Sequence, residues 1–196
     1  TSTNTVTLNI SSFVVDATTP WSQQSYIKAA NNDSYDWFGT SVSISVDSIA
    51  VGSSGEDSSQ TTITNTTAAS SLNDNSASGG VYVYKRSGTS WVQEAYIKAS
   101  NNAAADWFGG SVSIDADTIA VGARGEDSGT IAIINGMTSS SNDNSSRSGA
   151  AYVYKRYGNF WVQEAYIKAA NANGDNDSYF GHSVSIDGDT LAVSAI

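Results

Sequence analysis

Two pairs of adjacent carboxylates are the first candidates for acid–base catalysis in this sequence. Glu56-Asp57 and Glu126-Asp127 each lie in the tetrapeptide GEDS, and the two copies are 70 residues apart. Paired carboxylates serve as general acid and base in glycoside hydrolysis, but only when they converge on one bond. Adjacent residues on a strand or turn generally point apart. A pair that recurs once per repeat instead indicates a structural cap at a strand end, or a negative rim.

The remaining reactive residue types give no catalytic set. His182 is the only histidine, its counterparts in the repeat are Thr40 and Gly110, and the chain has no cysteine. No nucleophile elbow, phosphate loop or dinucleotide fingerprint is present, so nothing assembles a nucleophile with a base. We therefore predict that the protein is not an enzyme, has no catalytic residue and needs no cofactor.

The charge of the chain excludes two classes of partner. It has 196 residues, a formal net charge of −10 and a pI near 4.2. Nucleic-acid binding needs clustered Lys and Arg, so we expect none. No apolar run approaches the roughly 20 residues that span a bilayer, so we expect no membrane insertion. The acidity is typical of a soluble protein.

A segment of eight residues recurs at a fixed interval along the chain. YIKAANND begins at Tyr26, YIKASNNA at Tyr96 and YIKAANAN at Tyr166, which is a period of 70 residues. Self-similarity at a fixed period is the signature of a repeat architecture.

Each period predicts four strands. In the second copy, SVSI and TIAVGA flank the tight turn DAD, and AYVYKR and FWVQEAYIKA flank the turn YGN. A long polar loop joins the second and third strands, and no window sustains a helical stripe. A short antiparallel sheet repeated in tandem must stack on its neighbours to bury its faces. The sequence therefore predicts an all-β fold of tandem four-stranded antiparallel sheets of the β-propeller-blade type, or a linear pile of such sheets.

The repeat resembles the FG-GAP family, in a form similar to its bacterial-type branch, over about residues 11–196. The Phe-Gly pairs are Phe38-Gly39, Phe108-Gly109 and Phe180-Gly181. The Gly-Ala-Pro positions read Gly52-Ser53-Ser54, Gly122-Ala123-Arg124 and Ser194-Ala195-Ile196, so the proline is missing throughout and the last copy also lacks the glycine. The resemblance implies a β-propeller related to the head of integrin α-chains, usually extracellular and concerned with adhesion or ligand binding.

The resemblance also raises the question of calcium, because integrin-type repeats often carry a calcium loop between their first two strands. Here that connection is only Val46–Ser48, Asp115–Asp117 or Asp187–Asp189, and calcium needs about six to eight oxygen ligands. We therefore predict no metal site there. A weaker candidate is the loop before Phe-Gly, with Asp33 and Asp36 in one copy and Asp175 and Asp177 in another, while the middle copy keeps only Asp106.

Aromatic residues occupy two repeat-equivalent positions. Trp37, Trp107 and Tyr179 precede Phe-Gly, and Trp21, Trp91 and Trp161 open the fourth strand. Such side chains usually wedge one sheet against the next, because each ring buries a large area. The alternative is that Trp37, Trp107 and Tyr179 bind sugars by stacking on them, since some FG-GAP-like propellers are lectins.

The termini divide the chain into whole and half blades. Residues 1–10 are expected to add an arm or strand, 11–36 a half-blade of third and fourth strands, 37–106 and 107–178 two blades, and 179–196 a half-blade of first and second strands. Fewer than about four blades do not close a propeller, and open edges pair with available strands. We expect the half-blades to join copies of the chain.

These observations combine into one functional hypothesis and its alternatives. We predict a secreted or surface structural and adhesive protein that assembles head to tail into a fibre or ring through strand complementation. The alternatives are a lectin-like carbohydrate-binding module and a fragment of a larger adhesion propeller.

Because the chain begins at Thr1 and its only methionine is Met137, we expect a processed product or an excerpt. N-glycosylation sequons occur at Asn9, Asn32, Asn65, Asn144 and Asn176.

Overall fold

The computed structural model describes residues 22–171 and 177–196, which contain strands and no helix. The all-β prediction is confirmed. The predicted arm at residues 1–10, the residues Trp21 and Asp175, and the sequons at Asn9 and Asn176 lie outside the described residues.

The first sheet, here called blade 1, has the antiparallel order β1-β2-β3-β4. Its strands are β1 (Phe38–Ser45), β2 (Ser48–Ser53), β3 (Gly80–Ser87) and β4 (Ser90–Ile97). These bounds follow the period-2 segments of the sequence, and consecutive strands within each hairpin meet at two-residue turns.

The second sheet, blade 2, repeats this pattern and adds one strand, in the order β5-β6-β8-β9-β7. Its strands are β5 (Phe108–Asp115), β6 (Thr118–Ala123), β7 (Ile133–Asn135), β8 (Ala150–Tyr157) and β9 (Phe160–Ile167). A separate hairpin follows, formed by β10 (Val184–Asp187) and β11 (Thr190–Val193).

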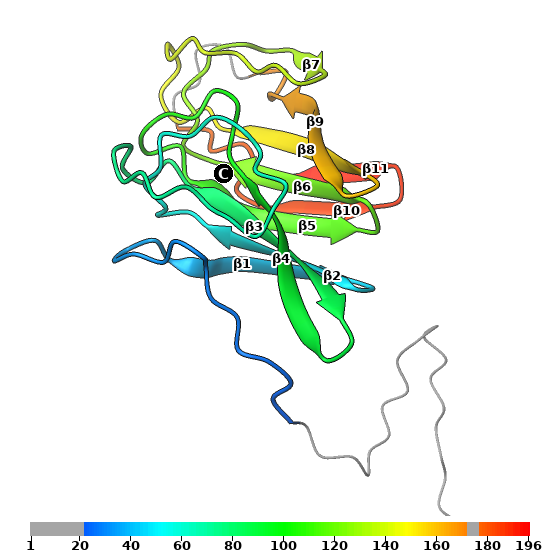
Figure 1. The fold of residues 1–196 in the computed structure, drawn as a ribbon. Coiled ribbons are helices and arrows are strands. Elements are labelled where there is room, and N and C mark those ends of the chain that lie inside the picture. Colours follow the sequence, from blue (N-terminus) through cyan, green and yellow to red (C-terminus); the bar gives the residue numbers. More distant parts are fainter. Residues whose placement is uncertain (1–21, 172–176) are drawn as a thin grey trace, which may run out of the picture.

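The sheets stack face to face as propeller blades do. The first strands of the three units are neighbours, since β5 contacts β1 on one side and β10 on the other. Figure 1 shows blade 1 in cyan and green below blade 2, with the red hairpin beside β5 and β6. The main core lies between blade 1 and blade 2, where Val81, Val83 and Ile97 meet Phe108 and Tyr152.

The long loop between the second and third strands returns to the outer edge of its own blade. In blade 2 it forms β7, which pairs with β9, and in blade 1 Thr64 exchanges two backbone hydrogen bonds with Tyr96. The sequence did not predict this strand, because the loop is polar and irregular. An uncovered edge strand exposes unpaired backbone groups, and the loop supplies partners for part of that edge.

Residues 22–37 contain no strand, although they align with the fourth strand of the later repeats. The segment nevertheless lies against blade 1 as a fourth strand would. Tyr84 donates its hydroxyl proton to the Lys28 carbonyl at 3.0 Å, and Trp91 donates to the Gln24 side chain at 3.3 Å. The half-blade over residues 11–36 stays a prediction, because the segment that would form its third strand lies outside the described residues.

Candidate functional site

The junction between blades is built on two glycines that approach each other closely. A Cβ on Gly52, at the end of β2, would lie 1.9 Å from the carbonyl oxygen of Gly109, which follows Phe108 in the next blade. At the next junction, a Cβ on Gly122 would lie 1.9 Å from the Gly181 carbonyl oxygen. The two halves of the repeat motif therefore meet across blades rather than within one.

Serine side chains on the first strands join neighbouring blades. The backbone N–H of Ile114 donates to Ser43 Oγ at 3.0 Å, and the N–H of Ile186 donates to Ser113 Oγ at 3.1 Å. The small polar residues of each SVSI segment therefore satisfy backbone groups of the following blade.

The outer part of the junction carries a cluster of a carboxylate, a guanidinium and an indole. A β-bulge in β4 leaves Glu94 without a partner residue in β3. Bulges of this kind change the direction in which a side chain points. Glu94 accepts hydrogen bonds from Trp161 Nε1 at 3.0 Å and from Arg156 Nη1 at 3.2 Å, both in blade 2. The Arg156 guanidinium also lies 5.3 Å from the centroid of the Trp161 ring.

The three candidate sugar-binding residues differ in exposure: Trp37 is exposed, whereas Trp107 and Tyr179 are half-buried. Trp37 is 58% exposed, and Trp37 and Trp107 lie against Gly55 and Gly125 of their own blades. The Arg124 guanidinium lies 4.9 Å from the centroid of the Trp107 ring, and Tyr179 accepts a hydrogen bond from Arg147 at 2.8 Å. No blade covers the Trp37 ring in the described residues, so the wedge interpretation has no support at that position. The tryptophan that packs between blades is Trp161.

Substituting Trp161 should therefore cost much more stability than substituting Trp37. We expect Trp161→Ala to lower the free energy of unfolding by about 3–5 kcal/mol, since it removes a fully buried ring. Trp37→Ala should change it by less than about 1 kcal/mol. Chemical denaturation of the two variants checks this, and equal losses would show that the Trp37 ring is buried in solution.

Both GEDS glutamates are buried and paired with a lysine of the YIKA phrase. Glu56 Oε2 lies 2.6 Å from Lys98 Nζ, and the side chains are 1% and 0% exposed. Glu126 and Lys168 repeat the pair in blade 2. Burial is the largest cause that lowers the pKa of the Lys98 amine, and Glu56 opposes it. The glutamates therefore have a structural position and do not form a negative rim.

An asparagine from the preceding repeat completes each cluster. Asn31 Nδ2 donates to Glu56 Oε1 at 3.1 Å, and Asn101 Nδ2 donates to Glu126 Oε1 at 3.0 Å. The hydroxyl of Tyr82 in turn donates to Asn31 Oδ1. The sequence did not indicate that these lysines and asparagines are partners of the glutamates. The signal that could have found them is that all three residue types recur with the same 70-residue period.

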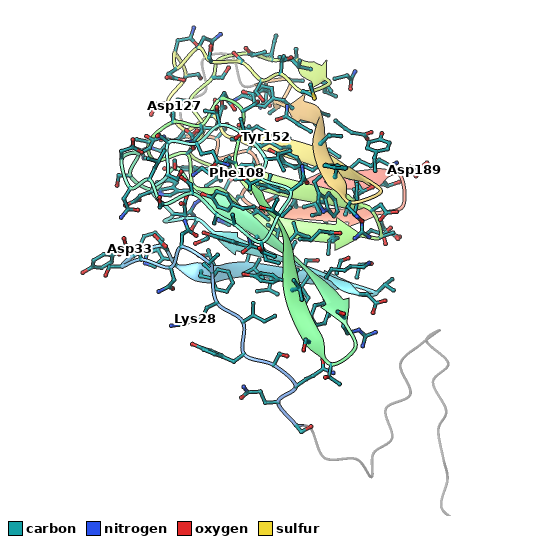
Figure 2. All side chains as sticks on the ribbon, viewed as in Figure 1. Lys28, Asp33, Phe108, Asp127, Tyr152 and Asp189 are labelled. Carbon is teal, nitrogen blue, oxygen red and sulfur yellow. The ribbon has the colours of Figure 1, made fainter. Side chains whose placement is uncertain are left out.

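Three other acidic residues contact protein groups rather than standing free in solvent. Asp57 Oδ1 accepts the N–H of Ala77 at 2.7 Å, Asp33 Oδ2 accepts from Asn73 at 2.7 Å, and Asp177 forms an ion pair with Arg147 at 3.3 Å. Among the described residues, no group of three or more His, Cys, Asp or Glu could hold a metal ion. Figure 2 shows Asp33 and Asp127 at the end of the blades that carries the long loops, and Asp189 at the opposite end.

Asp106, like its counterpart Asp36 in the preceding repeat, is buried and forms no ion pair in the described residues. Its Oδ2 accepts the N–H of Ala103 at 2.9 Å. The pKa of this carboxyl is raised to about 8, mainly by burial, with the hydrogen bond from Ala103 opposing the rise and the charges of Glu126, Asp127 and Asp143 adding to it. His182 is exposed on the surface, as a residue next to a strand start.

Two cavities of about 270 Å³ lie in the described part of the chain, and neither is lined by Trp37, Trp107 or Tyr179. One lies at the junction, between Ile63 of blade 1 and Tyr154 and Trp161 of blade 2. The other is a polar hollow between Asn31–Asp33 and Ser70–Asn73.

The described sequons differ in their surroundings. Asn32 and Asn144 are exposed, whereas Asn65 is half-buried at the junction, where its Nδ2 donates to the Trp161 carbonyl at 3.3 Å. A glycan on Asn65 would replace a proton of that amide nitrogen and place bulk between the blades.

No helix in the described residues is long and apolar enough to cross a membrane.

Comparison with known proteins gives one family. The family model described as FG-GAP repeat matches residues 21–84, 91–154 and 161–196. The second matched region runs from β4, the last strand of blade 1, into β8 of blade 2. A search of curated proteins found no match.

Proposed function

Because this chain belongs to the FG-GAP repeat family, whose repeats form β-propeller-type modules related to adhesion, we propose that it is an extracellular structural and adhesive module that joins copies of itself head to tail. The completed blade between two copies would combine the C-terminal hairpin of one with the N-terminal half-blade of the next. This contact is heterologous, so it propagates as a fibre or closes as a ring.

One observation carries the proposal: in the described part of the chain, the first blade has an apolar face that no other blade covers. Val42 and Ile44 on β1 are 61% and 63% exposed, whereas their equivalents on β5, Val112 and Ile114, are 8% and 5% exposed. The equivalents are buried because a preceding blade packs on them. Contiguous exposed apolar residues in a soluble protein mark an interaction surface.

The C-terminal hairpin has the residues that such a surface needs. By repeat position, Ser185 corresponds to Ser43, whose hydroxyl accepts the N–H of Ile114 in the next blade. Ser185 of one copy is thus placed to accept the N–H of Ile44 in another. In the described residues, the outer edge of β11 has no strand partner, whereas β2 and β6 at this position pair with a third strand. A third strand from another copy can add to that edge.

One residue makes this joint weaker than the junctions within the chain. Ser194 occupies the position of Gly52 and Gly122, where a Cβ would meet the carbonyl of the incoming Phe-Gly pair. We expect Ser194→Gly to strengthen association, measured as a lower dissociation constant by sedimentation. No change in association would count against a joint of this geometry.

Paired cysteines test the contact directly, since the natural chain has none. A variant with Ser185→Cys and Ile44→Cys should form disulfide-linked ladders of two or more chains. The control pair, Ser43→Cys with Ile114→Cys, has the same geometry within one chain and should give linked monomers only. Monomers at high concentration, or a Ser185–Ile44 link within one chain, would overturn the proposal.

Carbohydrate binding is the second candidate, supported by the exposure of Trp37 and of Tyr35, which is 82% exposed. A glycan array with Trp37→Ala as control tests it. Binding that disappears in a variant of unchanged stability would support a stacking site.

A further inference from the structure

Each buried cluster brings an amine and a carboxamide onto the two oxygens of one carboxyl group. In blade 1, Lys98 Nζ lies 2.6 Å from Glu56 Oε2, and Asn31 Nδ2 lies 3.1 Å from Glu56 Oε1. In blade 2, Lys168 and Asn101 contact Glu126 in the same way, with Asn101 Nδ2 at 3.0 Å from Oε1. This arrangement is more than a lysine–glutamate ion pair, because it holds a nucleophile, a proton carrier and an acyl group together.

We propose that each cluster is the site of an intramolecular amide cross-link, between Lys98 and Asn31 in blade 1 and between Lys168 and Asn101 in blade 2. The proposal is independent of the association between copies, because each bond lies within one chain.

The surroundings favour the nucleophilic form of the amine. The side chains of Lys98 and Glu56 are 0% and 1% exposed, and burial of an ion pair opposes charge separation. A desolvated lysine amine loses its proton more readily and becomes a nucleophile. The lysine is also oriented, since Lys98 Nζ lies 2.8 Å from Ser78 Oγ. In blade 2, Lys168 Nζ lies 2.7 Å from Ser148 Oγ.

The acceptor carbonyl is polarised by a tyrosine in both copies. Tyr82 donates to Asn31 Oδ1 at 2.5 Å, and Tyr152 donates to Asn101 Oδ1 at 2.8 Å. A buried donor aimed at a carbonyl oxygen stabilises the negative charge that develops there when the carbon is attacked. Figure 2 shows Tyr152 inside the stacked blades.

The reaction balances without an oxidant or a co-reactant. The Lys98 ammonium gives one proton to Glu56, and the neutral nitrogen forms a bond to Cγ of Asn31. Glu56 passes that proton to Asn31 Nδ2 and takes a second proton from the attacking nitrogen. The Cγ–Nδ2 bond then breaks, and the departing ammonia takes the second proton from Glu56 and leaves as ammonium. The glutamate is restored as a carboxylate.

The positions of the bonds give them a mechanical consequence. Each bond joins residues 67 positions apart, and only Ala99 and Ser100 lie between the two closed loops. Tension on the chain would pass through the bonds and bypass both blades. Each closed loop would otherwise add about 220 Å of extended chain. Such cross-links would suit a module that works under load.

Intact-mass spectrometry of the folded, purified chain tests the proposal. We expect a mass about 34 Da below that of the sequence, because each bond releases one ammonia of about 17 Da. A protease digest should contain branched peptides that link Lys98 to Asn31 and Lys168 to Asn101. A folded chain with the full sequence mass would overturn the proposal and leave the clusters as ion pairs.

Two variants assign the residues. Lys98→Arg keeps a cation beside Glu56 but removes the amine, and Glu56→Gln removes the proton carrier. Each should restore about 17 Da and leave the blade 2 bond intact. The amide survives denaturation, so the mass can be read even from a poorly folded variant. Chain kept in denaturant from synthesis should retain its full mass, because the bond requires the fold. A loss of mass in that unfolded sample would contradict the assigned mechanism.

Discussion

Gly52→Ala is expected to lower the free energy of unfolding by about 3 kcal/mol or more, because overpacking against backbone cannot be relieved by a rotamer change. The new Cβ would lie 1.9 Å from the Gly109 carbonyl oxygen and 2.3 Å from Ser41 Oγ. Blade 2 would have to move away from blade 1, which would open the core that holds Phe108 and Tyr152. Chemical denaturation, with near-ultraviolet circular dichroism as the readout of aromatic packing, checks this.

A pair of alanine substitutions separates the blade contact from the cost of glycine conformation. Gly39 and Gly109 are repeat-equivalent and have φ values of +92° and +82°, so alanine is strained at both positions. A Cβ on Gly109 would lie 2.5 Å from the Gly80 carbonyl oxygen, whereas nothing lies within 4 Å of one on Gly39. Gly109→Ala should therefore cost more than Gly39→Ala in the monomer. Equal costs would mean that the junction is looser than the structure shows.

Stability should fall as the pH rises from about 4 to about 8, in part because of Asp106. Burial raises the pKa of this carboxyl from its ordinary value of 3.8 to about 8 in the folded chain. Below the pKa of the unfolded chain, the Asp106 carboxyl is protonated in both states, and its titration does not change the free energy of unfolding. Between the two values the unfolded chain loses the proton and the folded chain keeps it, which favours unfolding. The linkage amounts to at most about 6 kcal/mol over this interval.

Asp106→Asn isolates this effect from the titration of the other acidic residues. The amide oxygen of Asn can still accept the Ala103 N–H, and the variant has no proton to lose. We expect the variant to be more stable than the natural chain at pH 8, with a smaller difference at pH 4. Asp36→Asn in blade 1 should act in the same direction, since burial raises the pKa of Asp36 as well. Parallel pH profiles for natural chain and Asp106→Asn would show that Asp106 is ionised in the folded protein.

The period of the repeat and the positions of most strands could be predicted from the sequence. A 70-residue period, period-2 segments and short turns are local properties of the chain, and local properties decide where strands begin and end. The bounds of β1–β4 and of their counterparts β5, β6, β8 and β9 follow from them, as does the family. The edge strand β7 did not follow, because a three-residue strand in a polar loop exists only where the edge of β9 needs a partner.

The burial and the contacts of each repeated residue depend on the tertiary structure. The sequence left Glu56 and Glu126 as either a strand-end cap or a negative rim, because nothing in a local window shows that Lys98 and Lys168 lie beside them. Trp37 and Trp107 have the same type and nearly the same φ, 54° and 53°, yet only Trp107 lies beneath an arginine. Val42 and Val112 belong to identical SVSI segments, and only Val112 is covered. Equivalent residues share a local conformation, but burial depends on whether a neighbouring blade is present, and no single repeat contains that neighbour.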